Sequence, residues 1–192
     1  AKTRFSTEKL YVDVGADFQQ SENDFEYLDT NDLFNANGQY ENLDLNFNAG
    51  YLLSTARDKT HILKLHHNTY LGDRNFSGTL TAPSNDAYED RNTRTLVAWE
   101  NLSKRYDGTL RLAHIYEQFR YFANNESGLN DLGKAARYLA NYEGTLKIDS
   151  SKRLTFLGEI NTISAAGASI ENASRRSASA VALWKHQLLS AL

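Results

Sequence analysis

The sequence predicts an all-β protein built as an antiparallel up-and-down sheet, and three observations support this fold class. The first is a period of two in hydrophobicity, clearest in NLDLNFNAGY (42–51), where Leu43 and Phe47 belong to an apolar row that alternates with Asn and Asp. Such alternation gives a strand one apolar and one polar face. The second is that the single proline, Pro83, interrupts none of the expected strands. The third is that no stretch shows the 3.6-residue stripe of an amphipathic helix.

The same alternation recurs along the chain. Leu10, Val12 and Val14 alternate with polar residues or glycine, and the segment from Tyr138 to Ile148 repeats the pattern. Other segments are less regular but rich in β-branched and aromatic residues, as strands are. The eight expected strands span residues 5–19, 40–53, 60–71, 92–102, 108–122, 136–148, 154–165 and 176–188.

The links between these strands alternate in length. We expect short turns at 54–59, 103–107 and 149–153, and long loops at 20–39, 72–91, 123–135 and 166–175. A soluble sandwich mixes hairpins with crossovers of varied length, whereas an outer-membrane barrel has short turns at one rim and long loops at the other. Several strands also exceed the five or six residues usual in soluble proteins. The pattern favours a transmembrane β-barrel over a soluble barrel or sandwich.

Composition excludes several other classes. The net charge of −3 and the pI near 6.0 argue against a nucleic-acid partner. The chain has no cysteine, which removes disulfides, thiolate metal sites and cysteine nucleophiles. With a mean hydropathy of −0.58 and no apolar run of about 18 residues, a helical membrane protein is excluded, but a membrane barrel is not. Methionine and a signal peptide are also absent, so we expect a mature portion or an excerpt of a longer protein.

Aromatic residues fall within or near the ends of the expected strands. In a membrane barrel they would form the girdles found at both interfaces, and the alternative is that strands are simply rich in aromatic residues. The residues concerned are Tyr11, Tyr51, Tyr70, Trp99, Tyr116, Tyr138 and Trp184.

The sequence offers no motif for catalysis or metal binding. His66 and His67 are adjacent in an expected strand, so they point to opposite faces, and His61 lies about 20 Å from His67 along the strand. No GxSxG, HExxH or phosphate-loop pattern occurs. We therefore expect no enzyme, no catalytic residue, no metal site and no cofactor.

The link 20–39 is strongly acidic and contains no Lys or Arg. It fits either a loop that meets cations or basic ligands or, as we prefer, an ordinary solvated loop. Its NDFEYLDTND segment lacks the glycine and the spacing of an EF-hand calcium loop. Its acidic residues are Glu22, Asp24, Glu26, Asp29 and Asp32.

The link 72–91 is the candidate ligand-binding loop. Arginine together with aromatic residues suits a polar organic ligand or a carboxylate, and the alternative is a surface loop without a ligand. The candidate binding residues are Arg74, Asn75, Phe76, Tyr88 and Arg91.

The stretch YLGDRNFSGTLTAPSNDAYEDRNTRTLVAWENL (70–102) resembles a region of TonB-dependent outer-membrane receptors. In those barrels a strand runs into a long loop and returns through an acidic-Arg-Asn segment to a Trp-bearing strand. The segments 103–122 and 140–161 are similar to the next hairpins, particularly in cobalamin- and siderophore-receptor-like members from Bacteroidetes. The resemblance covers most of the chain and is most specific in 70–102.

This resemblance implies that residues 1–192 are a section of a barrel of about 22 strands, without the plug domain and the remaining strands. The function implied is binding and import of a scarce solute such as a siderophore or cobalamin across the outer membrane. The implied partners are outer-membrane lipid, a small-molecule or chelate ligand, and the TonB complex acting through the plug. Leu43, Leu45 and Phe47 would then face lipid, while Asp44 and Asn46 face the lumen.

Two alternatives remain open from the sequence. One is a soluble eight-stranded barrel that holds a small ligand and points its apolar residues inward. The other is a small complete outer-membrane barrel with an adhesive or structural role.

Overall fold

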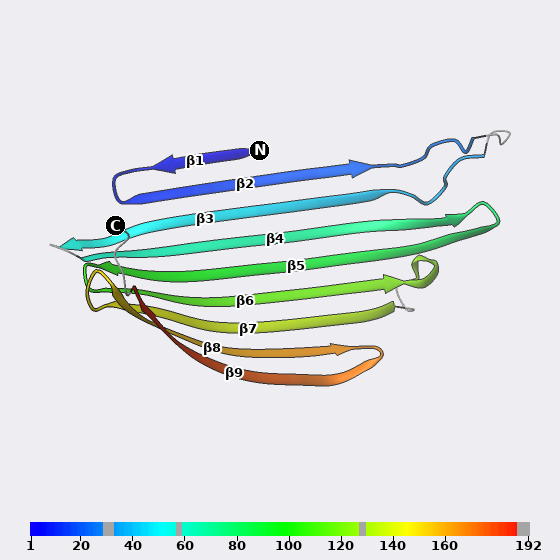
Figure 1. Ribbon diagram of the computed structural model, residues 1–192. Coiled ribbons are helices and arrows are strands. Elements are labelled where there is room, and N and C mark those ends of the chain that lie inside the picture. Colours follow the sequence, from blue (N-terminus) through cyan, green and yellow to red (C-terminus); the bar gives the residue numbers. More distant parts are fainter. Residues whose placement is uncertain (29–32, 57–58, 127–129, 188–192) are drawn as a thin grey trace.

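The chain folds into one open antiparallel sheet. The computed structural model describes residues 1–28, 33–56, 59–126 and 130–187. Each strand pairs with its sequence neighbours in the order β1 to β9, and β1 and β9 do not pair with each other in the described part of the chain (Figure 1). The strands are β1 (Lys2–Ser6), β2 (Leu10–Ser21), β3 (Tyr40–Ala56), β4 (Lys59–Thr79), β5 (Ala82–Ser103), β6 (Tyr106–Phe122), β7 (Asn130–Lys147), β8 (Lys152–Gly167) and β9 (Ile170–His186).

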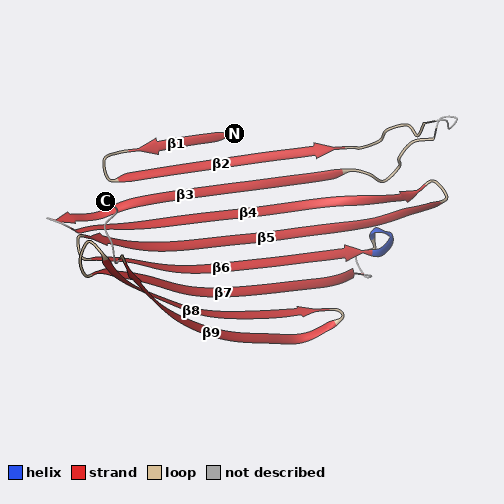
Figure 2. Cartoon of the chain, viewed as in Figure 1, coloured by secondary structure: helices blue, strands red, loops and turns tan. Residues whose placement is uncertain are grey.

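The fold confirms the predicted all-β class and the up-and-down order. The single helical element among the described residues is the short 3₁₀ turn η1 (Ala123–Asn125), visible beside the end of β6 in Figure 2. No helix in the described ranges has the length and apolarity needed to span a membrane.

The predicted number of eight strands is wrong, because the segment 5–19 is not one strand. The chain turns at residues 7–9, where the hydroxyl of Thr7 accepts hydrogen bonds from the backbone N–H groups of Leu10 (3.0 Å) and Lys9 (3.3 Å). The strand before this turn pairs back on the strand after it, with Phe5 opposite Val12. A side chain that accepts from the backbone ahead of it is a common way to close a tight turn.

The predicted long loops 72–91 and 166–175 are also wrong. β4 continues to Thr79 and β5 begins at Ala82, so 72–91 is a hairpin in which Arg74 pairs with Tyr88. Near its tip Gly78 has φ of +72°, a conformation that favours glycine. Likewise β8 ends and β9 begins around a turn at 168–169. Of the expected long loops, 20–39 persists as the link 22–39, and 123–135 shortens to 123–129.

The links fall at two rims of the sheet. The ends of β1, β3, β5 and β7 share one rim, here named the turn rim, and the ends of β2, β4, β6 and β8 share the other, named the loop rim (Figure 1). The expected placement of the short turns at one rim therefore holds, although the loop rim carries two tight hairpins that the sequence does not predict.

The register assigns every strand residue to one of two faces. Leu45 pairs with Ala16 on one side and Thr69 on the other, whereas its neighbour Asn46 pairs with Gly15 and Asn68. Paired residues point to the same face. The apolar face includes Val14, Phe18, Leu43, Leu45, Phe47, Tyr51, Leu63, Leu65, Val97, Trp99, Leu110, Leu112, Tyr138, Phe156, Ile160 and Trp184. The polar face includes Asp13, Asp44, Asn46, Asn48, Lys64, His66, Asn68, Arg94, Arg111, Glu117, Arg137 and Arg175.

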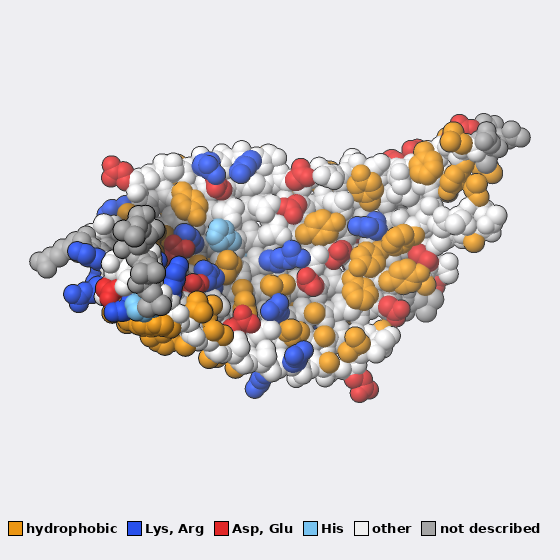
Figure 3. Space-filling view, viewed as in Figure 1, with side chains coloured by type: hydrophobic (Ala, Val, Ile, Leu, Met, Phe, Trp, Pro, Cys, Tyr) orange, Lys and Arg blue, Asp and Glu red, His pale blue; other side chains and the backbone are white. Residues whose placement is uncertain are grey.

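Figure 3 views the polar face, and side chains of both charge signs are spread over the middle of the sheet. Many of them bond to one another across strands. Lys64 donates to Glu100 at 2.7 Å, and Asn68 donates to Asp44 at 3.1 Å. Such a face suits water or a polar partner.

The described strands form no hydrophobic core of their own. Among the described residues the buried apolar side chains are only Ala87 and Ala98. Large side chains of the apolar face stay open, with Leu112 48%, Ile160 62% and Trp184 53% exposed. Globular domains pack such a face against a second layer. Here no second layer of the described chain covers the apolar face.

Candidate functional site

The five candidate ligand residues divide between the two faces. Arg74 and Tyr88 are cross-strand partners on the polar face, and Phe76 lies on that face two residues nearer the loop rim. The rings of Phe76 and Tyr88 meet edge to face with centroids 6.4 Å apart. The other two, Asn75 and Arg91, have the opposite parity and belong to the apolar face.

Asn75 holds the long link rather than facing a groove. Its side-chain amide donates to Asn37 Oδ1 at 2.9 Å, and its backbone N–H donates to the carbonyl of Gln39 at 2.9 Å. Asn37 is buried, and its own amide donates to the carbonyl of Phe76 at 2.8 Å. These bonds fasten the end of the 22–39 link to the β4–β5 hairpin.

Arg91 lies in a charged band at the loop-rim edge of the apolar face. Its guanidinium is 3.8 Å from the carboxylate of Glu89, which is also 3.6 Å from Arg120. Asp73 pairs with Glu89 in the same row. This band ends the apolar stretch of β4–β6.

The acidic link 22–39 is closed by backbone and amide bonds. Glu26 forms an isolated bridge with Phe34, and Asn35 donates to the carbonyl of Asn23 at 2.6 Å. Glu22 and Asp24 are exposed. The remaining predicted acidic residues, Asp29 and Asp32, lie outside the described residues. No group of three or more His, Asp or Glu side chains in the described ranges is placed to hold a metal ion.

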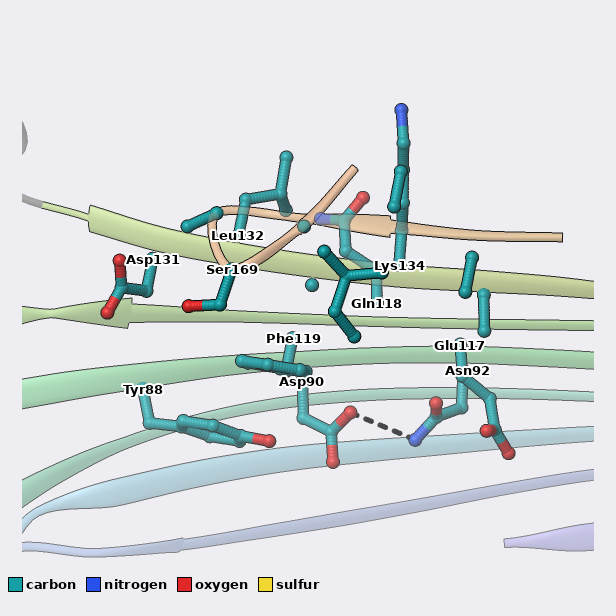
Figure 4. A pocket seen from close by; sticks show the side chains of 17 residues that line it. Tyr88, Asp90, Asn92, Glu117, Gln118, Phe119, Asp131, Leu132, Lys134 and Ser169 are labelled. Carbon is teal, nitrogen blue, oxygen red and sulfur yellow. Dashed lines mark hydrogen bonds between the residues drawn. The ribbon is translucent and has the colours of Figure 1, made fainter. Parts of the chain in front are cut away.

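A groove of about 560 Å³ lies on the polar face near the loop rim, between β5 and the β8–β9 turn (Figure 4). Its volume falls within the range usual for small-molecule sites. The residues that line it from the polar face are Tyr88, Asp90, Asn92, Glu117, Phe119, Asp131, Gly133, Ala135, Ala165 and Gly167, and the turn adds Ala168 and Ser169.

Small residues create this groove. Phe119 pairs with Gly133, which pairs in turn with Gly167. A Cβ atom at Gly133 would lie 2.1 Å from Cε1 of Phe119, so the ring leans over the glycine. In the next row Glu117 pairs with Ala135. Bulky side chains on β5 and β6 thus face glycine and alanine on β7 and β8, which leaves a trough.

Aromatic rings form one wall of the groove. Tyr88 and Phe119 stack with centroids 6.0 Å apart and an interplanar angle of 9°. The Phe119 side chain remains 44% exposed, so part of its surface is free for a ligand. Burial raises the pKa of Tyr88, Asp90 raises it further and Arg74 opposes the shift, so the phenol stays neutral at physiological pH.

The groove is rich in carboxylates. Asp90 is the cross-strand partner of Phe119 and accepts a hydrogen bond from Asn92 at 3.0 Å (Figure 4). Glu117 lies 3.4 Å from Arg94, but both side chains are more than half exposed, so this pair is weak. Lys134 follows Gly133 in sequence and therefore belongs to the apolar face, and its side chain points away from these carboxylates in Figure 4.

Sequence reasoning identified Tyr88 but missed Phe119, Asp90 and Gly133. The LGKAA run at 132–136 is a visible signal of small residues. Its meaning depends on the β6–β7 register, which sets Gly133 opposite Phe119, and a single sequence does not specify that register.

No family model and no curated protein matches this chain. The fold and the groove define a class of structure: a single-layer, amphipathic, antiparallel sheet with a hollow on its polar face near one rim.

Proposed function

We propose that the chain is part of the wall of an outer-membrane TonB-dependent receptor that binds and imports a scarce solute. The observation that carries this proposal is the exposed apolar face of a single-layer sheet. The resemblance of residues 70–102 to such receptors supports it independently. In this proposal lipid covers the apolar face, and the open edges at β1 and β9 pair with further strands of the barrel.

The energetics favour a nonpolar environment for the apolar face. Burial of apolar surface stabilises by roughly 25 cal/mol per Å², and side chains such as Phe156 and Trp184 are about half exposed in the isolated sheet, at 47% and 53%. An open sheet with this face in water would aggregate. Hydrocarbon removes that penalty, while the polar face keeps water or a polar partner.

The charged band supports lipid over a packed soluble interior. β4 and β5 continue beyond the row of Asp73 and Glu89 for several residues toward the loop rim. The interior of a small soluble barrel is filled with side chains along its length. A membrane has a finite hydrocarbon thickness, which a spanning strand crosses in roughly 9 to 11 residues. The apolar stretch of β3, from Leu43 to Tyr51, matches that length.

One polar cluster interrupts the apolar face, and its groups are mutually satisfied. The ring of His67 bonds through Nδ1 to Thr95 Oγ1 at 2.9 Å and through Nε2 to Thr69 Oγ1 at 3.1 Å. Because both ring nitrogens have partners, this cluster avoids most of the penalty of an unpaired polar group in hydrocarbon.

Spin labels at positions 45 and 46 test the proposal. The chain contains no cysteine, so Leu45→Cys and Asn46→Cys each give one labelling site, and both native side chains are exposed. In lipid vesicles, oxygen should relax the label at 45 strongly, and a water-soluble nickel chelate should relax the label at 46. The reversed pattern, or a chain that stays soluble and monomeric without detergent, would refute the membrane-wall function.

A further inference from the structure

We propose that the groove beside Phe119 binds an organic cation with a flat apolar ring. As an account of what the receptor takes up, this inference rests on the proposed function. As a binding site, it stands on the groove itself and is measured without transport.

The first step of the argument is the row that crosses the groove. From β5 to β8 the paired residues are Asp90, Phe119, Gly133 and Gly167. Neighbouring strands lie about 4.8 Å apart, so a carboxylate, an aromatic ring and two glycines follow one another over roughly 14 Å. The Phe119 ring leans over Gly133 and keeps 44% of its surface exposed, so a flat ligand ring would stack on that exposed surface.

The second step is the charge around that ring. Asp90 pairs directly with Phe119, Glu117 lies two residues along β6 on the same face, and Asp131 lies two residues from Gly133 on β7. Of the Lys and Arg residues in the described part of the chain, Arg94 alone forms an ion pair with any of these three carboxylates. The groove therefore has a net negative charge.

The third step combines the two. An ammonium group is attracted both to carboxylates and to the face of an aromatic ring. A carboxylate ligand would meet like charges, and a neutral ring would gain no attraction from the carboxylates. The chemistry of the lining thus selects a ring that bears a cationic arm.

Three probes that share one ring test this selection. Tryptamine is cationic at pH 7, tryptophol is neutral and indole-3-acetate is anionic. Binding of each is measured by equilibrium dialysis against the full chain in detergent micelles, with empty micelles in the reference chamber. We expect tryptamine to bind about tenfold more tightly than tryptophol and indole-3-acetate to bind most weakly.

Substitutions in the groove locate the site. Asp90→Asn and Asp131→Asn keep side-chain shape and remove charge, so each should weaken tryptamine binding by roughly threefold to tenfold and leave tryptophol unchanged. Phe119→Leu keeps an apolar side chain without a ring and should weaken both probes. The matched control is Asp17→Asn, which removes a carboxylate from β2 on the same face, outside the groove, and should change neither.

The possible outcomes separate the two proposals. Equal binding of tryptamine and tryptophol, preference for indole-3-acetate, no binding at millimolar concentration, or insensitivity to the groove variants would each overturn the cation site. None of these outcomes alters the labelling pattern at positions 45 and 46. A reversed labelling pattern would refute the membrane wall while leaving selective cation binding intact.

Discussion

Followed from the turn rim toward the loop rim, the apolar face of β3 meets its first charged residue at Glu41, and that of β9 meets its first at Arg176. These two residues nevertheless lie six residues apart in register. The row that contains Arg176 reaches β3 at Phe47, six residues closer to the turn rim than Glu41. The residues of that row are Phe47, His67, Thr95, His114, Tyr138, Thr162 and Arg176.

Between β3 and β6 the boundary of the apolar face nevertheless runs straight across the strands, because Glu41, Asp73, Glu89 and Arg120 share one register row. Arg91 of β5 and Lys134 of β7 lie two residues closer to the turn rim, in the row of Gln118. The six-residue offset of Arg176 therefore arises mainly between β7 and β9, and the apolar stretch of β3 to β7 ends at nearly the same register level.

Charge substitutions on the two faces should have unequal effects. Leu45→Arg places a cation in the apolar stretch of β3 and should lower the free energy of unfolding by about 2 to 4 kcal/mol if that stretch lies in lipid. Asn46→Arg, one residue away on the polar face, should change it by less than about 1 kcal/mol. Urea titration of the chain in lipid vesicles measures both. Equal destabilisation by the two substitutions would argue against lipid at Leu45.

The sequence predicted the faces of the central strands because environment imposes them there. Leu45 and Asn46 alternate since one side of β3 is apolar and the other polar, and the register confirms that division. Beyond the charged band Phe76 and Tyr88 lie on the polar face and Asn75 on the opposite one, so the apolar–polar alternation of β3 does not continue there. Residues 72–91 therefore resemble a loop, with Gly78 and Pro83 as turn signals, although backbone pairing continues to the hairpin tip.

The groove could not be predicted for a different reason. Its floor depends on Gly133 lying opposite Phe119, and its charge depends on Asp90 lying opposite the same ring. These neighbours are 14 and 29 residues apart in sequence. Only the register, set by the summed pairing of β5, β6 and β7, brings them together.

Asn37 should anchor the 22–39 link. Asn37→Ala removes an amide that donates to the carbonyls of Phe76 (2.8 Å) and Ser84 (3.3 Å) and accepts from Asn75. Loss of a buried hydrogen-bonding partner should lower stability by about 1 to 3 kcal/mol. Hydrogen exchange followed by mass spectrometry should show faster exchange in peptides covering residues 33–40 and 74–86. Protection equal to that of the unmodified chain would show that the amide is not the anchor.

The turn between β7 and β8 should weaken in acid. Asp149 accepts hydrogen bonds from the hydroxyl and backbone N–H of Ser151, both at 2.8 Å, and from the N–H of Lys152 at 2.9 Å. These bonds, those of Ser151 foremost, lower its pKa from the usual 3.8 to about 2. Because the folded pKa is depressed, the stabilisation is complete above the unfolded value and is lost as the pH falls from about 4 toward 2.

The comparison of the unmodified chain with Asp149→Ala measures this effect. The difference in urea midpoint between them should be largest at pH 5 and should shrink as the pH approaches 2. Glu8→Gln, in the β1–β2 turn at the same rim, is the control for loss of a carboxylate. A difference that stays constant across this pH range would contradict the assigned role of Asp149.

Tyr11 and Gly50 should be energetically coupled. They are cross-strand partners on the polar face, and a Cβ at Gly50 would lie 2.0 Å from Cε1 of Tyr11, so the ring covers the glycine. Gly50→Val must displace that ring, whereas in a Tyr11→Ala background the valine meets open space and favours the strand. Cross-strand pairs of this kind contribute about 0.2 to 1 kcal/mol.

The double variant should therefore be more stable than the sum of the two single variants predicts, by at least about 0.5 kcal/mol. Urea unfolding of the four chains in lipid vesicles gives the coupling free energy directly. A second cycle with Tyr11→Ala and Gly158→Ala serves as control, because nothing lies within 4 Å of a Cβ built at Gly158. Additive effects in the first cycle would show that the ring does not rest on Gly50, and coupling in both cycles would point to a change in the unfolded state instead.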